Sequence, residues 1–345
     1  MGTINSFTIV NSIMTENKVD FVWSSNKDYS CILPLFQYMK KIGWNVNIYK
    51  IHRHLFRNRS IVRKLASHAI AAYDVPMKRL QKMRWDGRFI YVDHGVGPIK
   101  YYAYRYKQFF DCELLFYQGE VFKRKMELLN PNFKNGLLGG FTKMDELVTI
   151  KIDRELMCAK YRLNPDKPII LFAPTWGGKY SNHWGIKNAK YLTNFPNLII
   201  APHSGDYKYA KRFNAVIPEK ISNINMFIKL CDVVVSDISS IIGEAAAIGK
   251  SIVQIILPSY PGCFPNFEKR KEGTWIPDDV IFDEENKTDR EKRPFKIAYL
   301  DEDWIVGQTA KPENLREAVQ EVIENPEKFK GVFENILKDK VKSLF

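Results

Sequence analysis

Two histidines stand where a strand-like segment ends, and each could act as an acid or a base. His94 follows the β-favouring residues 89–92 and precedes Gly95. His203 follows the apolar residues 198–201 after one intervening proline. Imidazole titrates near neutral pH, so a positioned histidine can take a proton from a hydroxyl or donate one to a phosphate. Together the two could serve one cleft as base and donor, although either one alone could equally be a structural or solvated residue.

A third polar segment, residues 233–250, runs from a buried type of strand into a helix and suits an anion. Ser239 and Ser240 stand at the expected helix start, and Glu244 follows about one turn later. Free amide groups and the helix dipole attract phosphate at such a position, and the hydroxyls add donors. The Glu244 carboxylate could accept hydrogen bonds from a ribose diol. The serines, with Asp237, would also make an ordinary helix cap, so this segment alone leaves both interpretations open.

A fourth segment places Thr175 and two glycines directly after the apolar residues 169–173, where backbone could approach a ligand closely. Several common site motifs are absent from the sequence. There is no H-E-x-x-H, no P-loop, no G-x-G-x-x-G after the first strand and no G-x-S-x-G, and no D-x-D pairing offers an obvious metal site. The sequence therefore predicts no metal site and no cofactor, and it disfavours dinucleotide redox chemistry and P-loop nucleotide hydrolysis.

The candidate site residues named above lie in a chain whose strand-like and helix-like segments alternate, and these segments must position them. The expected strands are residues 19–24, 45–51, 89–92, 114–117, 169–173, 198–201, 233–235 and 251–257. The expected helices are residues 32–42, 121–129, 153–161, 224–231, 238–248, 312–324 and 326–340, with a mostly helical pattern over 50–88 and a loop over 283–294. This alternation is typical of parallel α/β folds, in which ligands bind beyond the carboxyl ends of the strands. Two Rossmann-like domains facing a cleft, a glycosyltransferase-B type of architecture, are therefore predicted.

The boundary between the two predicted domains lies close to a polar helix that ends at an Asn-Pro-Asp-Lys-Pro segment, residues 164–168. Residues 1–155 are expected to form the acceptor-side domain, with basic helices that could face a membrane. Residues 156–345 are expected to form the donor-binding domain, with closing helices near the C-terminus.

Charge and cysteine content limit the partners of the protein and its compartment. The formal net charge is +13 at pH 7, which favours an anionic partner. An anionic membrane surface is a candidate, because residues 50–88 combine basic and apolar side chains; the same run could be a solvated face. No RNA-binding signature is present, so nucleic acid is not expected. Five scattered cysteines, no convincing signal peptide and no apolar run of about 20 residues predict a cytoplasmic protein whose membrane contact is peripheral.

Five short motifs, taken in order, resemble the CDP-glycerol:polyglycerophosphate glycerophosphotransferase family of teichoic-acid and capsule enzymes. The matching segments are His94-Gly95, residues 140–145 (Gly-Phe-Thr-Lys-Met-Asp), residues 173–176 (Ala-Pro-Thr-Trp), Pro202-His203, and residues 236–240 (Ser-Asp-Ile-Ser-Ser) with Glu244. They cover about residues 90–257, and their order is more specific than any one of them. Three departures are visible: Glu244 replaces the commoner Asp, Thr142-Lys143 replaces a Pro-Arg pair, and Gly177-Gly178 replaces an Arg.

The resemblance implies transfer of a polyol phosphate from a CDP-activated polyol to a hydroxyl, with release of CMP. The acceptor would be a cell-surface polymer or a lipid-linked molecule. The residues implied are His94 as acceptor base, His203 on the pyrophosphate, Ser239 and Ser240 on phosphate, and Glu244 on ribose. We predict Thr175 and Lys143 as further donor-phosphate contacts, and Gly95 and Asp237 as supporting residues.

Two other classes of function remain open from the sequence. A nucleotide-sugar glycosyltransferase or epimerase of glycosyltransferase-B fold would use Glu244 and the same serine loop for a different donor. A non-enzymatic basic module would use residues 50–88 as its footprint on a membrane or a nucleic acid.

Overall fold

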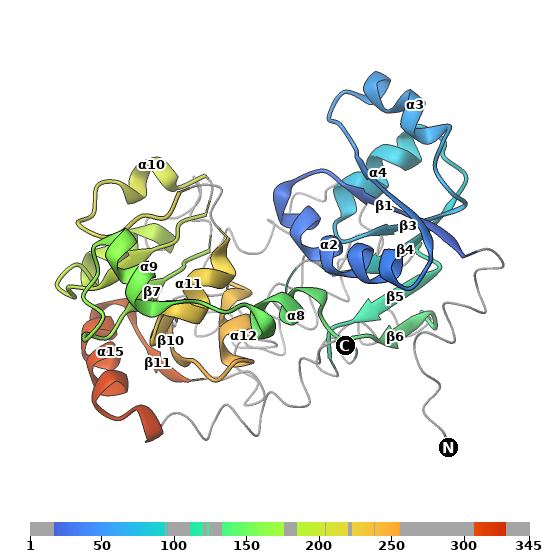
Figure 1. Ribbon diagram of the computed structural model, residues 1–345. Helices are drawn as coiled ribbons and strands as arrows, with labels where there is room; N and C mark the ends of the chain where they lie inside the picture. The colour runs from blue at the N-terminus through green and yellow to red at the C-terminus, as the bar shows by residue number, and fades with distance from the viewer. Residues whose placement is uncertain are drawn as a thin grey trace, which may run out of the picture.

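The computed structural model describes residues 17–93, 95, 111–119, 123, 133–175, 185–203, 205–219, 223–237, 239–255 and 307–328. Four of the sequence predictions lie wholly or mostly outside these ranges. They are His94, the helix over 121–129, the loop over 283–294 and the helix over 326–340. Figure 1 shows two α/β lobes, each with a parallel sheet, one built on β1–β6 and the other on β7–β11.

The first sheet contains six parallel strands in the order β2-β1-β3-β4-β5-β6. The strands are β1 (Lys18–Trp23), β2 (Asn45–Lys50), β3 (His68–Ala71), β4 (Arg88–Val92), β5 (Leu114–Tyr117) and β6 (Gly136–Leu138). Successive residues of β1 face opposite sides, as a strand requires. Phe21 belongs to one core cluster with Ile32 of helix α2 (Asn26–Lys41), and Val22 to another with Met77 of helix α4 (Asp74–Lys82). Helices therefore cover both faces.

Helix α2 follows β1 directly and is capped by its own sequence. The Ser25 side chain accepts from the Asp28 amide, and the Asp28 carboxylate accepts from the Ser24 and Ser25 amides at 2.6 Å each. The helix ends at Lys41, and Gly43 turns the chain with a φ of +89°, a conformation that glycine adopts easily. The sequence predicted this helix only from residue 32, so its first turn was missed.

The second sheet contains five parallel strands in the order β11-β10-β9-β7-β8. The strands are β7 (Ile170–Phe172), β8 (Leu198–Ile200), β9 (Val233–Ser236), β10 (Ser251–Ile255) and β11 (Gln308–Ala310). Helices α12 (Ile241–Ala246) and α15 (Leu315–Glu324) both pack on β9 and β10. Strands β7, β8 and β9 are buried along their whole length, which is why they read as nearly continuous apolar runs.

Helix α8 (Thr142–Thr149) lies between the lobes, as Figure 1 shows, and is bonded to both. On the first lobe, the Thr142 hydroxyl donates to the carbonyl of Cys31 in α2. On the second lobe, the Glu146 carboxylate accepts from Asn223 at 2.6 Å and from Asn225 at 2.7 Å, at the start of α11 (Ile224–Leu230). The connection between the lobes is therefore a hydrogen-bonded helix. The predicted boundary between residues 155 and 156 falls in the next helix, α9 (Arg154–Tyr161), and stays a prediction.

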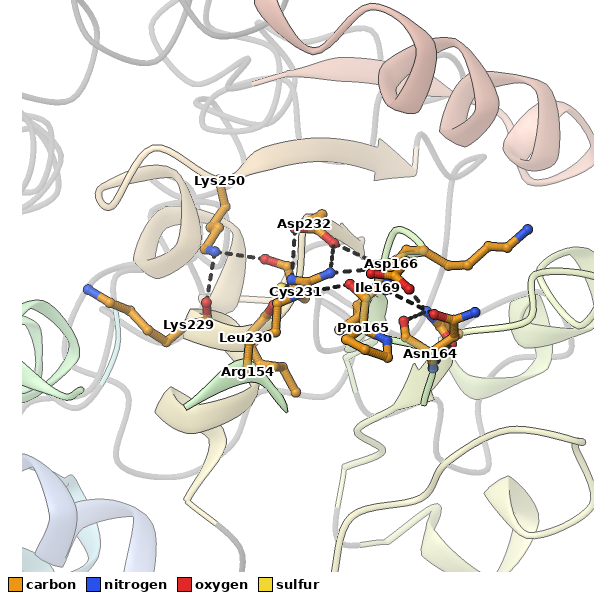
Figure 2. Close-up of polar contacts among 12 residues, drawn as sticks. Arg154, Asn164, Pro165, Asp166, Ile169, Lys229, Leu230, Cys231, Asp232 and Lys250 are labelled. Atoms are coloured by element: carbon orange, nitrogen blue, oxygen red, sulfur yellow. Dashed lines mark hydrogen bonds and ion pairs between the residues drawn. The ribbon is translucent and has the colours of Figure 1, made fainter. Parts of the chain in front are cut away.

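A polar network ties α9 to the amino edge of the second sheet, the edge at which its strands begin (Figure 2). The Arg154 guanidinium pairs with Asp232 at 2.9 Å and also donates to the carbonyls of Pro165, Lys167 and Leu230. Asp232 in turn accepts from the amide of Ile169, just before β7. These contacts fix the chain as it enters two strands.

The structure corrects the expectation of a mostly helical segment over residues 50–88. Strand β3 lies inside it, between a 3-10 turn η1 (Leu55–Asn58) with helix α3 (Arg59–Val62) and helix α4. His68, which the sequence suggested to be within a helix, begins this strand. Its four residues include two alanines, so burial against neighbouring strands decides the conformation rather than intrinsic propensity. Within the described ranges, no helix is long and apolar enough to cross a bilayer.

Candidate functional site

Each sheet has a point where the strand order reverses, and ligands of open α/β sheets bind in the crevice at such a point. In the first sheet it lies between β1 and β3, and in the second between β7 and β9. The loop after β7 carries Thr175, and the loop after β9 carries Asp237. Both residues are buried, and the Thr175 amide donates to Asp237 Oδ1 at 2.9 Å. Asp237 thus holds the Thr175 loop in place, which is a supporting contact.

Ser239 and Ser240 follow Asp237 and precede α12, and both are half-buried. Ser240 occupies the N-cap position, but its side chain makes no capping hydrogen bond. Instead its hydroxyl approaches Glu244 Oε1 at 3.5 Å, near the limit for a hydrogen bond. The simple capping interpretation therefore does not account for the Ser240 side chain.

Glu244 lies one turn further on and forms an ion pair that joins the second lobe to α8. Its Oε2 accepts from Lys143 Nζ at 2.8 Å, and the exposed fractions of the two side chains are only 4% and 11%. Burial acts to lower the pKa of Lys143, but the groups around it, with the Glu244 carboxylate first among them, together outweigh burial, and the net pKa is raised. Two residues predicted to contact the donor are therefore bonded to each other, although 101 positions separate them in sequence.

The loop that follows β4 meets the second lobe at this point. An alanine methyl group at Gly95 would come within 3.1 Å of Ser240 Oγ, so the two residues are in close contact. The Gly95 carbonyl also accepts from the buried amide of Gln118 at 3.2 Å. The turn that contains His94 is thus adjacent to the serine loop, although His94 itself lies outside the described residues.

His203 follows β8 and is exposed on its own loop. The amide of Gly205 donates to His203 Nδ1 at 3.3 Å, and the His203 carbonyl accepts from Asp206 at 2.8 Å. With Nδ1 as an acceptor, a neutral imidazole carries its proton on Nε2. His203 can therefore present an N–H group to an oxyanion.

The structure brings most of the predicted residues into two groups. Gly95, Ser240, Glu244 and Lys143 are linked by direct contacts, and Thr175 with Asp237 forms the neighbouring loop pair. The contacts of His203 given above are within its own loop, so they do not connect it to either group. The roles assigned to these residues stay predictions.

Two residues that the sequence did not single out also reach this region. The Gln118 side-chain amide donates to the Gly95 carbonyl. Lys27, in the first turn of α2, interacts electrostatically with Lys143, Glu244 and Asp93. A sequence signal for Lys27 exists, because it follows the β1 strand and two serines at a position where parallel sheets bind ligands. For Gln118, which follows β5, only its position after a strand gives a hint.

Cysteine and metal chemistry receive no support from the described residues. Burial raises the pKa of Cys31, close to the Lys143–Glu244 pair, to about 12, so its thiol stays protonated and poorly nucleophilic. In the ranges given above, no group of three or more His, Cys, Asp or Glu side chains is placed to hold a metal ion.

Comparison with solved structures identifies the architecture. The chain is similar to the wall teichoic acid polymerase TagF, with a TM-score of 0.63 at 15% identity over 94% of this chain and 85% of that one. It is also similar to a UDP-GlcNAc 2-epimerase from Neisseria meningitidis bound to UDP-GlcNAc, with a TM-score of 0.59 at 13% identity over 93% and 95%. A putative UDP-N-acetylglucosamine 2-epimerase from Listeria monocytogenes gives 0.60 at 11% identity over 96% and 94%.

No protein-family model matches the sequence, and no curated protein matches it either. At such low identities the structural likeness establishes the fold alone. The chain has the predicted α/β architecture of two Rossmann-like lobes of the glycosyltransferase-B type.

Proposed function

We propose that the protein transfers glycerol phosphate, or a related polyol phosphate, from a CDP-activated donor to a hydroxyl of a cell-surface polymer or lipid-linked acceptor and releases CMP. The observation that carries the proposal is the contact between Gly95 and Ser240. It puts the turn of the candidate base beside the loop of the candidate phosphate ligands. A TagF variant with one histidine replaced by asparagine, soaked with CDPG, is among the similar structures, which supports this type of donor.

In this proposal the second lobe holds the donor. Ser239 and Ser240 donate to its phosphates, Thr175 approaches them from the neighbouring loop, and His203 donates through Nε2. Glu244 accepts from the ribose, because among the described residues its Oε1 has only the long contact to Ser240. Lys143 neutralises Glu244, so that the carboxylate does not repel the phosphates, and donates to them as well.

The first lobe holds the acceptor, and His94 takes the proton from the acceptor hydroxyl. The hydroxyl oxygen attacks the β-phosphorus of the donor, and a new oxygen–phosphorus bond forms. The bond between that phosphorus and the bridging oxygen breaks, and its electron pair leaves on CMP. Negative charge grows on the leaving phosphate, where the serine hydroxyls and His203 stabilise it. Positioning and electrostatics supply most of the rate, as in other phosphoryl transfers.

A second candidate function is a nucleotide-sugar glycosyltransferase or epimerase. The buried Glu244 beside the serine loop would serve a uridine nucleotide as well as a cytidine nucleotide, and two of the similar structures are UDP-GlcNAc 2-epimerases. The first candidate is preferred because of the motif order around His94 and His203.

A donor-panel assay separates the two candidates. The purified protein is incubated with CDP-glycerol, CDP-ribitol, UDP-sugars and GDP-sugars, and the released nucleotide is identified by chromatography. Release of CMP from a CDP-polyol is the expected result. Release of UDP, or conversion of a UDP-sugar to its epimer without nucleotide release, would establish the second candidate instead.

An anionic membrane surface is part of the proposal, because a lipid-linked acceptor would be found there. Phe56 in the turn η1 is 65% exposed, Leu55 beside it is 36% exposed, and the Arg57 guanidinium lies 5.9 Å from the Phe56 ring centre. Four further exposed cations lie near them in the sequence: Arg53, Arg59, Arg63 and Lys64. Exposed aromatic and aliphatic groups combined with basic side chains are typical of interfacial binding.

Two other cations of the basic run are bonded within the protein itself. Arg79 donates to the carbonyl of Ile51, and Lys78 pairs with Asp74. The candidate surface is therefore residues 53–64 rather than the whole segment 50–88. Wild-type protein should sediment with vesicles containing anionic lipid, and a Phe56→Ser/Arg57→Ser variant should sediment less. Equal sedimentation of both proteins would remove the membrane from the proposal, together with the predicted location at the inner face of the cell membrane.

A further inference from the structure

The loop between β1 and α2 mirrors the donor loop of the second lobe. It follows the strand at which the order of the first sheet reverses, just as the loops of Thr175 and Asp237 flank the reversal in the second sheet. By the general rule for open α/β sheets, this is the ligand-binding crevice of the first lobe. The loop is Ser24 and Ser25, and Asn26 and Lys27 follow it in the first turn of α2.

The backbone amides of Ser24 and Ser25 are already hydrogen-bonded, so they are not available to bind an anion. The Asp28 carboxylate already accepts from the Ser24 and Ser25 amides at 2.6 Å, and it also binds the Ser24 hydroxyl at 3.1 Å. A carboxylate in that position repels a second anion. Any anion site at this loop therefore depends on a side chain that reaches beyond it.

Lys27 is such a side chain. It is exposed to solvent, yet surrounding protein lowers its pKa by desolvation, and Lys143 lowers it further. The charges of Glu244 and Asp93 act in the other direction. The Thr142 hydroxyl bonds the carbonyl of Cys31, one turn after Lys27, so α8 with its Lys143 lies against the start of α2. Lys27 is therefore a solvent-accessible lysine close to the point where the two lobes are joined.

The position of Lys27 is unfavourable in the ligand-free protein. Its charge is in the first turn of a helix, where the macrodipole favours anions, and it is repelled by Lys143. Glu244 is already bonded to Lys143. Among the described residues, the Lys27 ammonium makes no ion pair and no hydrogen bond. An anion bound between Lys27 and Lys143 would reduce both the repulsion between the two lysines and the unfavourable interaction of Lys27 with the helix dipole.

We infer that Lys27 is a substrate-binding residue, which holds the diphosphate of the nucleotide donor from the first lobe while Ser239 and Ser240 hold it from the second. The inference rests on the proposed two-sided site but not on the identity of the base. It assigns a donor contact to the lobe that was expected to serve the acceptor alone.

The test is calorimetric titration of CDP, UDP and CMP into the wild-type protein and three variants. Lys27→Met removes the charge with little change in side-chain length, and Lys27→Arg keeps it. Lys40→Met is the matched control, because Lys40 is an exposed cation on the same helix about 20 Å away. We expect Lys27→Met to weaken binding of the preferred diphosphate about tenfold to a hundredfold, and CMP binding by less. Lys27→Arg should keep most of the affinity, and Lys40→Met all of it.

The outcomes separate this inference from the proposed function. If the protein binds UDP and not CDP, the CDP donor is wrong, and the same variants test Lys27 with UDP. Equal diphosphate affinity of wild type and Lys27→Met would overturn the inference even if CMP release is observed. An absence of any diphosphate binding by the wild-type protein would overturn it as well.

Discussion

Two ion pairs of this protein each join residues that are far apart in the sequence, but one pair is partly exposed and the other is buried. Arg154 and Asp232 are 2.9 Å apart at the amino edge of the second sheet, with exposed fractions of 36% and 42%. Lys143 and Glu244 are 2.8 Å apart between the lobes, with exposed fractions of 11% and 4%. The first pair is surrounded by backbone groups that it also binds (Figure 2), whereas the second lies among hydroxyls and a further lysine.

The difference teaches how to tell a structural pair from one beside a site. Arg154 uses its donors on three carbonyl groups as well as on Asp232, so little capacity remains for a ligand. Lys143 is taken out of water, and much of its attraction to Glu244 is used to offset that desolvation cost. A buried ion pair of this kind is weak evidence for stability, and its place between two lobes favours a role in binding.

The largest expected effect is on catalysis by the two histidines. His94→Ala and His203→Ala should each lower CMP release by about 10²- to 10⁴-fold, because a proton acceptor or an oxyanion donor is lost. His68→Gln is the control, since His68 lies at the amino edge of the first sheet and binds Glu113 at 2.7 Å. Circular dichroism checks that all three variants fold. Full activity of either alanine variant would contradict the role assigned to that histidine.

The next largest effect is on the free energy of unfolding, and it distinguishes the buried Lys143–Glu244 pair from the partly exposed Arg154–Asp232 pair. Glu244→Gln leaves the Lys143 ammonium buried without its carboxylate, which should cost about 3–5 kcal/mol in the free energy of unfolding. Urea unfolding measures it. The double variant Lys143→Met/Glu244→Leu should recover most of the loss, because no isolated charge remains. A cost below about 1 kcal/mol for Glu244→Gln, the value for a surface pair, would show that water reaches it.

Arg154→Met should have a smaller effect, about 1–2 kcal/mol, because Asp232 keeps its bond from the Ile169 amide and its exposed part is solvated. The same urea experiment measures it. Nucleotide affinity should not change, since the network is at the edge of the sheet opposite the serine loop. A loss of CDP binding in this variant would contradict the separation of the two regions.

The smallest effect is on pH dependence. The pKa of Lys27 is lowered below its ordinary value of 10.5, so CDP affinity should decrease as the pH rises from 8 to 10 and the free ammonium loses its proton. Lys143, the other lysine facing it and the partner of Glu244, has a raised pKa and stays charged over this range. The expected decrease is about threefold to tenfold, and Lys27→Arg should abolish it. The same decrease in Lys27→Arg would assign the titration to another group.

The sequence predicts the second lobe better than the first, for a physical reason. Strands β7, β8 and β9 are buried on both faces, so their apolar runs are continuous and easy to recognise. Strand β3 contains two alanines, and β6 begins with a glycine and is only half-buried, so both depend on pairing with an adjacent strand. Helix α8 was missed because its contacts are with residues of both lobes that are distant in the sequence, so no local sequence pattern predicts it.

The candidate site shows the same limit. Thr175, Ser240 and Glu244 each follow a recognisable strand, so the sequence could nominate them. The bond between Lys143 and Glu244 spans 101 positions, and only the folded chain reveals it. Lys27 belongs to the first turn of a helix whose start was placed too late, and its surroundings come from the other lobe.

The strand order of both sheets has a consequence for synthesis on the ribosome. In the first sheet β1 and β2 pair, and each later strand from β3 to β6 joins an edge that is already exposed. In the second sheet β7 and β8 pair first, and β9, β10 and β11 then join in the same manner. None of the described strands has to be inserted between two neighbours, so each sheet can grow as the chain emerges. Thr142, whose hydroxyl bonds α2 of the first lobe, is synthesised just before the second lobe begins to appear.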